Sequence, residues 1–361
     1  MKIGILSFPN STSFGATLQM YALYSTVQEL GIDVEIINYH NAYMKAEKHM
    51  SASKMAHARR IIRKIAHHRQ AYRFRKFEKG MSLYPRKPFQ DKALLLDVGK
   101  RYDRVICGSD QVWNPDITDY DMSYFLDFCG EERARISYAP SFGVKSLPES
   151  MQNGVQNELK MFDHLSVREK EGQQIIRELI GKEVPLVLDP TFLLSAGKWT
   201  QLEKYHSAAD EPYILYYVVR SSKTLMRFCL DLAEKMNVRI VIVGGNLLRQ
   251  IRNKNPKICY AYDIGPQEWL YLVHHAACVV TNSFHGTAFS INYQKDFYVE
   301  FSSLTNSRLE HIIGIAGLHS RVVKSGCAPE AERIEYTPVN SVFSVLRVQS
   351  MEFLREAVIS D

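Results

Sequence analysis

A histidine within a turn of small polar residues is the part of this sequence best suited to chemistry. His285 follows an apolar, strand-like run and precedes a helix-like stretch that starts at Ala288. A turn from a strand into a helix exposes backbone N–H groups, which attract anions together with the helix dipole. Histidine is also the side chain whose ordinary pKa lets it give or take a proton near neutrality. We therefore expect an anion-binding turn with a proton donor. The residues expected around the anion are Ser283, Gly286 and Thr287.

A core histidine with satisfied hydrogen bonds is the competing interpretation of His285. Its small polar neighbours argue against a core position, because a glycine such as Gly286 lets a ligand approach the backbone. Arg308, at a predicted helix start, offers a second anion contact.

The loop Gly108–Pro115 follows another predicted strand and carries polar and aromatic side chains. Carboxylates and amides hydrogen-bond the hydroxyls of a sugar, and an indole covers its apolar face. Asp110 is the candidate that orients or deprotonates an acceptor hydroxyl. The residues expected to bind the acceptor here are Gln111, Trp113 and Asn114. The alternative is an ordinary turn with a packed tryptophan.

The loop Phe8–Ala16 follows the first predicted strand and is rich in small polar residues. Asn10 and Ser13 are candidates for further acceptor contacts. No Gly-x-Gly-x-x-Gly is present, which disfavours a dinucleotide site. A plain connection between strand and helix is the alternative.

Arg168 follows a predicted strand that ends at Val167. An arginine at this place can hold a phosphate or a carboxylate with two hydrogen bonds. An ion pair with Glu169 is the structural alternative. Asp189-Pro190 favours a turn rather than a site.

Alternating strand-like and helix-like segments predict two α/β domains with parallel sheets. In such sheets ligands bind beyond the carboxyl ends of the strands, and the default site is a cleft between two facing domains. The predicted domains are 1–205, with a basic helical insertion at about 45–80, and 206–335, which carries His285. A helical segment, 336–361, is expected to pack back on either domain. The predicted strands are Lys2–Ser7, Val34–Asn38, Tyr102–Cys107, Ile136–Ala139, His164–Val167, Pro185–Leu188, Tyr213–Val219, Arg239–Val243, Cys278–Thr281 and Phe297–Glu300.

Six scattered cysteines form no Cys-x-x-Cys pair, which disfavours a zinc site or a disulfide framework. His274 and His275 lie in a helix-like run without a matching ligand cluster, so no metal site is expected.

The first apolar run is too short for a signal peptide, and no stretch has the length of a membrane span. These features predict a cytoplasmic protein, and they leave its oligomeric state open.

Positive charge is concentrated in one segment. Lys45–Lys79 holds 12 Lys and Arg against 2 acidic residues, whereas the whole chain carries a net charge of only +6. Such a segment can bind an anionic membrane, an anionic substrate or nucleic acid, or can be a solvated helical face. A nucleic-acid-binding protein is the non-enzyme alternative, but no recognised binding motif accompanies the charge.

The motifs together resemble the polysaccharide pyruvyl transferase family. The similar segments are Phe14–Leu23, Gly108–Asn114, Ser166–Glu169, Asp189–Thr191, Thr281–Thr287 and Ser307–Leu309. The resemblance implies two Rossmann-like domains of the GT-B glycosyltransferase type. It also implies transfer of the pyruvyl group of phosphoenolpyruvate to two hydroxyls of a sugar, with His285 as the catalytic histidine and Arg168 as the donor-binding arginine.

The expected acceptor is a surface polysaccharide or its lipid-linked precursor, with the basic segment at the inner membrane face. The expected reaction needs no metal, nicotinamide or flavin. A GT-B glycosyltransferase that uses a nucleotide sugar is the alternative on the same scaffold. The sequence leaves open the acceptor sugar, its linkage and the stereochemistry of the ketal.

Overall fold

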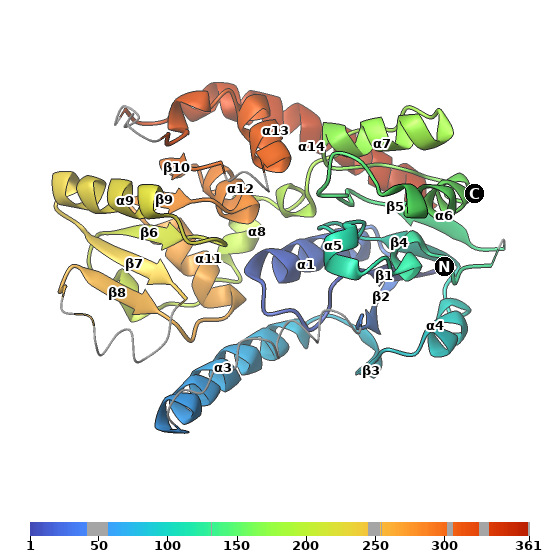
Figure 1. Cartoon of the computed structure of the whole chain (residues 1–361), viewed down its shortest axis with the longest axis horizontal. Helices are drawn as coiled ribbons and strands as arrows, with labels where there is room; N and C mark the ends of the chain where they lie inside the picture. The colour runs from blue at the N-terminus through green and yellow to red at the C-terminus, as the bar shows by residue number, and fades with distance from the viewer. Residues whose placement is uncertain are drawn as a thin grey trace. The chain divides into compact units, whose positions relative to one another are not determined.

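A computed structural model describes residues 1–41, 57–130, 132–244, 253, 255–301, 306–324 and 332–359. The chain divides into two compact units. Unit 1 comprises Met1–Ala52, Glu78–Leu194 and Ser344–Asp361, and unit 2 comprises Ser53–Phe77 and Ser195–Phe343. Each unit has one parallel sheet of five strands, drawn in Figure 1.

The sheet of unit 1 has the strand order β3-β2-β1-β4-β5. Its strands are β1 (Lys2–Leu6), β2 (Asp33–Tyr39), β3 (Leu83–Phe89), β4 (Arg104–Cys107) and β5 (Ala134–Ser137). Isolated bridges join Ile136 to His164 and Val167 to Leu186, so two further extended segments continue the parallel pairing beyond β5. Near-continuous apolar runs such as Ile3–Leu6 suit this arrangement, because a parallel sheet is covered on both faces.

Helices of unit 1 connect these strands. They are α1 (Phe14–Glu29), α4 (Lys92–Gly99), α5 (Pro115–Thr118), α6 (Glu149–Lys160) and α7 (Lys170–Ile180), with the short 3-10 helices η1 (Met122–Phe125) and η2 (Pro190–Phe192). Ser13 caps the start of α1 by accepting a hydrogen bond from the backbone N–H of Ala16. This cap satisfies one of the N–H groups that a helix start leaves without a partner.

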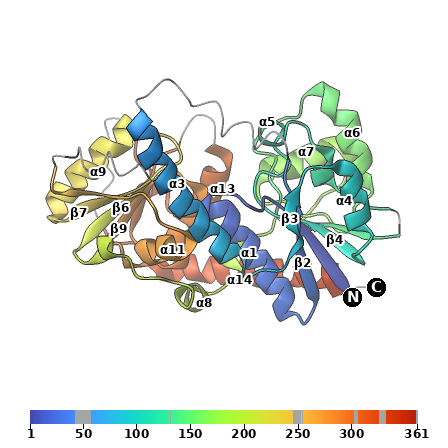
Figure 2. The same ribbon diagram turned by 90° about the horizontal axis from the view of Figure 1, so that it is seen from below.

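The sheet of unit 2 has the strand order β10-β9-β6-β7-β8. Its strands are β6 (Tyr213–Tyr217), β7 (Arg239–Val243), β8 (Ile258–Ala261), β9 (Cys278–Thr281) and β10 (Phe297–Val299). Its helices are α3 (His57–Glu78), α8 (Ala196–Thr200), α9 (Lys223–Met236), α11 (Pro266–His275), α12 (Phe284–Asn292) and α13 (Asn306–Ala316), with η3 (Ser207–Ala209) and η4 (His319–Arg321). Figure 2 shows α9 and α11 on opposite sides of this sheet.

The two sheets have the same topology. In each, the first strand is central, the next two follow on one side, and the chain then returns to the other side of the first strand. This is the Rossmann-like arrangement, and it confirms the predicted fold class.

The boundary between the units lies between Leu194 and Ser195, earlier than the predicted 205. Ser195 caps α8, and Trp199 of that helix packs edge to face against Phe289 of α12 at 5.0 Å, so the segment after Leu194 is part of unit 2. Most of α3 also belongs to unit 2, where Arg73 forms an ion pair with Glu268.

The last helix, α14 (Tyr336–Ile359), contributes residues to both units. In unit 2 the hydroxyl of Tyr336 donates to the carbonyl of Lys295 at 2.6 Å. In unit 1 the hydroxyl of Ser350 accepts from the backbone N–H of Leu188 at 2.9 Å, and Leu354 is fully buried. The predicted C-terminal helix therefore exists, and it serves two cores rather than one.

Part of the basic segment Lys45–Lys79 lies outside the described residues. Within it, α3 is described from His57 and its side chains from His68. None of the described helices is both long and apolar enough to cross a bilayer.

Candidate functional site

The switch point of the first sheet lies between β1 and β4, where the strand order reverses. Ligands of open α/β sheets bind at the carboxyl ends of the strands beside such a point. The loops that follow β1 and β4 begin with Ser7 and Gly108, and they carry Asn10 and Asp110. The sequence predictions for this unit therefore fall at the place that the topology favours.

Arg168 lies in a buried ion-pair network at this edge of unit 1. One guanidinium nitrogen contacts Asp189 Oδ2 at 2.5 Å, and Nε lies 3.7 Å from Glu169 Oε2. Burial disfavours the charged form of the guanidinium, but the carboxylates around it, first Asp189 and then Glu169, outweigh this and raise the pKa of Arg168. The side chain is only 3 % exposed. These contacts favour the structural alternative, an ion pair, over a freely offered anion grip.

Asp189 connects this network to its neighbours. Its Oδ1 accepts from the backbone N–H of Thr191 at 3.0 Å and from the Thr191 hydroxyl at 2.7 Å, which caps η2. Its Oδ2 also accepts from the hydroxyl of Ser109 at 3.3 Å. The Asp-Pro turn predicted from the sequence is confirmed, and the same carboxylate fixes Arg168.

The backbone of Asp110 adopts a left-handed conformation, with a φ of 78°. Its Oδ1 accepts from the N–H of Gln111 at 2.8 Å, and its carbonyl accepts from the N–H of Ser141 at 2.8 Å. The side chain is half-buried. Asn10 and Ala139, which follow β1 and β5, also have positive φ, of 59° and 53°. Backbone strain of this kind is concentrated at functional sites, since the surrounding structure must hold it in place.

Trp113 is fully buried, which corrects the expectation that its indole covers a sugar. It stacks on Phe125 at 5.0 Å and packs against Phe142 and Phe162. Its indole N–H donates to the carbonyl of Tyr124 at 2.8 Å. The structure therefore supports the alternative interpretation, a turn with a packed tryptophan.

Asn114 and Gln111 are hydrogen-bonded to each other, Nδ2 to Oε1, at 2.8 Å. Asn114 Oδ1 also accepts from the N–H of Asp116 and so caps α5. A Cβ on Gly143 would lie 2.4 Å from Gln111 Oε1, so this glycine is needed for the pair to fit. Asn114 thus serves as a helix cap, and the acceptor roles of Asn114 and Gln111 stay predictions.

Asn10 and Ser13 differ in what their side chains do. Asn10 Nδ2 donates to Asn38 Oδ1 at 2.6 Å, and its backbone N–H donates to Glu78. Ser13 is exposed and caps α1. Their acceptor roles stay predictions.

The switch point of the second sheet lies between β6 and β9, and His285 follows β9 there. Asn282 joins the two loops. Its Oδ1 accepts from the N–H of Val219 at 2.9 Å, and its Nδ2 donates to the carbonyl of Arg220 at 2.7 Å. The turn before α12 is thereby fixed against the loop after β6, and Arg220 remains exposed.

His285 is the second residue of α12 and is 8 % exposed. Its ring meets that of Phe284 edge to face, with centroids 5.2 Å apart. The predicted place of a histidine at a helix start after a strand is confirmed. His285 lies in unit 2 and Arg168 in unit 1. That both contact the same substrate in a cleft between the domains stays a prediction.

The polar residues around His285 make hydrogen bonds within the start of the helix. The hydroxyl of Ser283 accepts from the N–H of Gly286 at 3.3 Å, and the carbonyl of Ser283 accepts from the N–H of Thr287 at 3.0 Å. These two N–H groups are therefore engaged within the turn. The turn is also closely packed, because a Cβ on Gly286 would lie 2.4 Å from Thr281 Oγ1 and 3.1 Å from Tyr217. Gly286 leaves room for these neighbours, and the donor contacts predicted for Ser283, Gly286 and Thr287 stay predictions.

Arg308 is buried and lies near the start of α13, which packs against α12. Its predicted anion contact stays a prediction.

A family model for polysaccharide pyruvyl transferases matches residues 14–299, which is most of the chain. This protein belongs to the polysaccharide pyruvyl transferase family. It is accordingly a transferase that acts on a polysaccharide. The match includes β4, β6 and β9 with His285, and it leaves out β1, Asn10, Ser13 and Arg308. No curated protein matches the chain in sequence.

Solved structures place this pyruvyl transferase family member in the GT-B-like fold class. A glycosyltransferase from Rickettsia africae is similar with a TM-score of 0.56 and 10% identity, over 100% of this chain and 99% of that one. A UDP-GlcNAc 2-epimerase from Neisseria meningitidis, solved with UDP-GlcNAc, is similar with a TM-score of 0.50 and 11% identity, over 100% of this chain and 95% of that one. At these identities the similarity concerns the fold alone.

The sequence prediction also missed a group of metal-binding residue types in this family member. Glu203 lies beside His274 and His275, so the expectation that the histidines lack a matching ligand cluster is wrong. Glu203 is far from both in sequence, and no motif connects them. The sequence prediction also missed the hydrogen bonds of Asn282 to Val219 and Arg220, because these residues are far apart in the sequence. The position of Asn282 at the end of a predicted strand, three residues before His285, was a usable signal.

Proposed function

We propose that this protein transfers the pyruvyl group of phosphoenolpyruvate to two hydroxyls of a sugar and so forms a cyclic ketal. The observation that carries the proposal is the position of His285 at the switch point of the second sheet in a chain of this family. A titratable side chain at a fixed helix start suits proton transfer, for which a positioned group contributes about 10²–10⁴-fold in rate.

The chemistry needs a proton donor and then an acceptor for protons. His285 donates a proton to the methylene carbon, which becomes a methyl group, and a sugar hydroxyl bonds to the central carbon. The bond between that carbon and the phosphate oxygen then breaks, phosphate leaves, and the second hydroxyl closes the ketal. One hydroxyl proton restores His285 and the other leaves with phosphate or solvent. We assign the removal of this second proton to Asp110, which then passes it to phosphate or solvent and whose carboxylate is held by the N–H of Gln111.

A product assay tests this reaction directly. The full chain is incubated with phosphoenolpyruvate, carbon-13 labelled at its central carbon, and a panel of oligosaccharides. We expect equal amounts of released phosphate and of a sugar that has gained a pyruvyl group, with the label at a carbon bonded to two oxygens. Sugar transfer from a nucleotide sugar, with no turnover of phosphoenolpyruvate, would establish the glycosyltransferase alternative instead.

The part played by Arg168 separates into two testable roles. If Arg168 binds the donor, Arg168→Lys raises the KM for phosphoenolpyruvate while the protein stays folded. If its ion pair with Asp189 only orders the loops, the same change lowers thermal stability and leaves the KM of the folded fraction near that of the wild type. We favour the second role because the guanidinium is buried against two carboxylates.

The acceptor that we propose is lipid-linked, at the surface of an anionic membrane. The support is the charge of Lys45–Lys79. Charge reversal of Arg59, Arg60, Arg63 and Lys64 is expected to abolish binding to anionic liposomes. Charge reversal of four exposed lysines elsewhere (Lys160, Lys170, Lys182 and Lys235) is the matched control. Equal loss in both variants would point to net charge rather than to this segment.

A further inference from the structure

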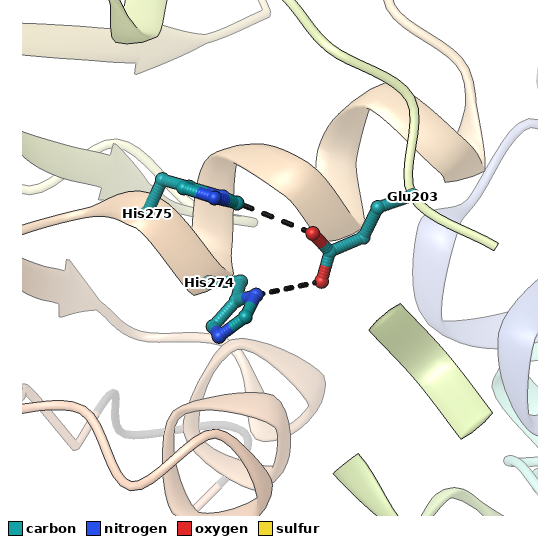
Figure 3. A group of neighbouring side chains, drawn as sticks. All are labelled: Glu203, His274 and His275. Atoms are coloured by element: carbon teal, nitrogen blue, oxygen red, sulfur yellow. Dashed lines mark hydrogen bonds and ion pairs between the residues drawn. The ribbon is translucent and has the colours of Figure 1, made fainter. Parts of the chain in front are cut away.

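Three potential metal ligands from two distant segments come together in unit 2. Glu203 follows α8, and His274 and His275 are the last two residues of α11. His274 Nδ1 lies 2.9 Å from Glu203 Oε1, and His275 Nδ1 lies 3.8 Å from Glu203 Oε2. One ligand atom from each residue lies within 4.8 Å of the others. Figure 3 shows the carboxylate facing both imidazoles.

The carboxylate of Glu203 needs a positive partner. Its side chain is only 6 % exposed, whereas those of His274 and His275 are 35 % and 42 % exposed. Among the described residues, its ionic partners are these two histidines. A buried carboxylate is costly unless it is paired with a charge, and a neutral imidazole supplies only a hydrogen bond. A bound cation satisfies this requirement.

The three ligands are held in place by their surroundings. The ring of Tyr293 stacks on His274 with centroids 4.6 Å apart, and the ring of Tyr271 stacks on His275 at 3.9 Å. The backbone N–H of Lys204 donates to the carbonyl of Gln267 at 3.1 Å, and Gln267 Nε2 donates to the carbonyl of Leu202 at 3.0 Å. These bonds fix the residues on both sides of Glu203. Ligands that are already oriented lose little freedom when an ion binds.

We propose that Glu203, His274 and His275 bind a divalent transition-metal ion of the zinc type. With bonds of about 2.0–2.2 Å, neighbouring ligands of a tetrahedral zinc lie roughly 3.4 Å apart. His274 Nδ1 and Glu203 Oε1 are closer than this value, at 2.9 Å, and the three ligand atoms all lie within 4.8 Å of one another. Small side-chain movements therefore bring the atoms into range, and the exposure of both histidines leaves the fourth position open to solvent.

The donor set selects among metals. Two imidazoles and one carboxylate suit zinc, cobalt, nickel and copper, whereas magnesium and calcium take oxygen ligands. His275 Nδ1 also lies 2.9 Å from the carbonyl of Tyr271. An ion bound through this nitrogen replaces that hydrogen bond, which lowers the affinity of the site.

The site would stabilise unit 2 rather than take part in the transfer reaction. Tyr293, which stacks on His274, is the C-terminal cap of α12, whereas His285 lies at the start of that helix. A helix of nine residues is about 13 Å long at 1.5 Å per residue. The ion would thus join α11, the segment around Glu203 and the far end of α12. This inference is independent of the proposed pyruvyl transfer.

Metal titration of the tag-free, chelator-treated full chain tests the site. Calorimetry with zinc chloride is expected to show one equivalent bound, and cobalt is expected to give the visible absorption of a tetrahedral ion. Glu203→Gln and His274→Ala should each weaken zinc binding at least about tenfold. His319→Ala removes an exposed histidine elsewhere in unit 2 and should leave binding unchanged.

Circular dichroism confirms that each variant is folded before titration. His275→Asn changes the most exposed of the three ligands, so it keeps the test valid if Glu203→Gln fails to fold. The absence of zinc binding by the wild type would overturn the proposal. The proposal would also be overturned if the folded variants of Glu203, His274 and His275 bound zinc as tightly as the wild type. Displacement of zinc by an equal concentration of magnesium would overturn it as well.

Discussion

The switch points of the two sheets share a topology, but different kinds of side chain fix the loops around them. In unit 1 the strand-end loops are tied together by buried carboxylates, chiefly Asp189 with Arg168. In unit 2 the turn before α12 is held by neutral groups. Ser283 caps the helix, and Asn282 clamps the neighbouring loop.

This difference shows how one architecture is adapted to two tasks. Buried charges must be fully paired, so they fix the loops of unit 1 and leave Arg168 little freedom to meet a substrate. Neutral caps satisfy the backbone around α12, so His285 is the titratable group of that turn. We therefore expect changes in the ion-pair network of Asp189 and Arg168 to act mainly on stability, and the change of His285 to act mainly on the reaction.

The largest effect is expected from His285→Ala. Loss of a positioned proton donor should lower kcat by about 10²–10⁴-fold, with little change in the thermal melting temperature. Phosphate release from phosphoenolpyruvate in the presence of acceptor measures kcat. If the variant keeps most of its turnover, His285 is a core histidine and the contrast between the units fails.

Asp189→Ala tests whether buried charge stabilises unit 1. Removal of one partner leaves Arg168 buried without its nearest carboxylate, which should lower the free energy of unfolding by about 3–5 kcal/mol. Urea titration gives this value. The exposed ion pair of Arg177 with Glu183, at 3.2 Å, is the control, and Glu183→Ala should cost about 1 kcal/mol or less. Equal costs in the two variants would contradict the network.

Gly286→Ala tests the packing of the turn in unit 2. The new Cβ meets Thr281 Oγ1 at 2.4 Å, so the variant should lose about 1–3 kcal/mol of unfolding free energy and part of its turnover. Gly314→Ala is the control, since that glycine is an exposed residue of α13 whose Cβ meets nothing closer than 3.9 Å. The control should gain about 0.5–1 kcal/mol, because alanine favours a helix. If Gly286→Ala is as stable as the wild type, the turn is not closely packed at this position.

The smallest effect concerns pH and Asp121 of unit 1, which caps η1 beside Trp113. Burial opposes ionisation of Asp121, but hydrogen bonds from Lys92 and Tyr39 outweigh it and hold the pKa of this carboxyl below its usual range. A depressed pKa contributes stability that is present above the unfolded value of about 3.9 and is lost as pH falls through the folded value.

Urea titrations from neutral to acid pH measure this contribution. Asp121→Asn should be less stable than the wild type by about 1–3 kcal/mol near neutrality, and the difference should shrink as the pH falls below about 4. A difference that stays constant over this range would mean that the charge of Asp121 plays no part.

The sequence patterns located some elements well and missed others for physical reasons. Apolar periodicity predicted β1, β6 and β9 within one or two residues of the observed bounds. It missed β3, whose residues Leu83–Phe89 include two prolines, because proline lacks the N–H that a strand ladder uses. It also missed β8, which has only four residues and therefore gives a weak periodic signal.

The sequence alone determined the family, the parallel α/β class and the strand-end location of His285 and Asp110, because these depend on residue order and local periodicity. Only the tertiary structure decided that Trp113 is core, that Ser283 and Gly286 serve the helix start, and that Glu203 joins His274 and His275. A side chain's role depends on which groups reach it through space. Residues 71 positions apart, such as Glu203 and His274, leave no trace of their contact in local spacing.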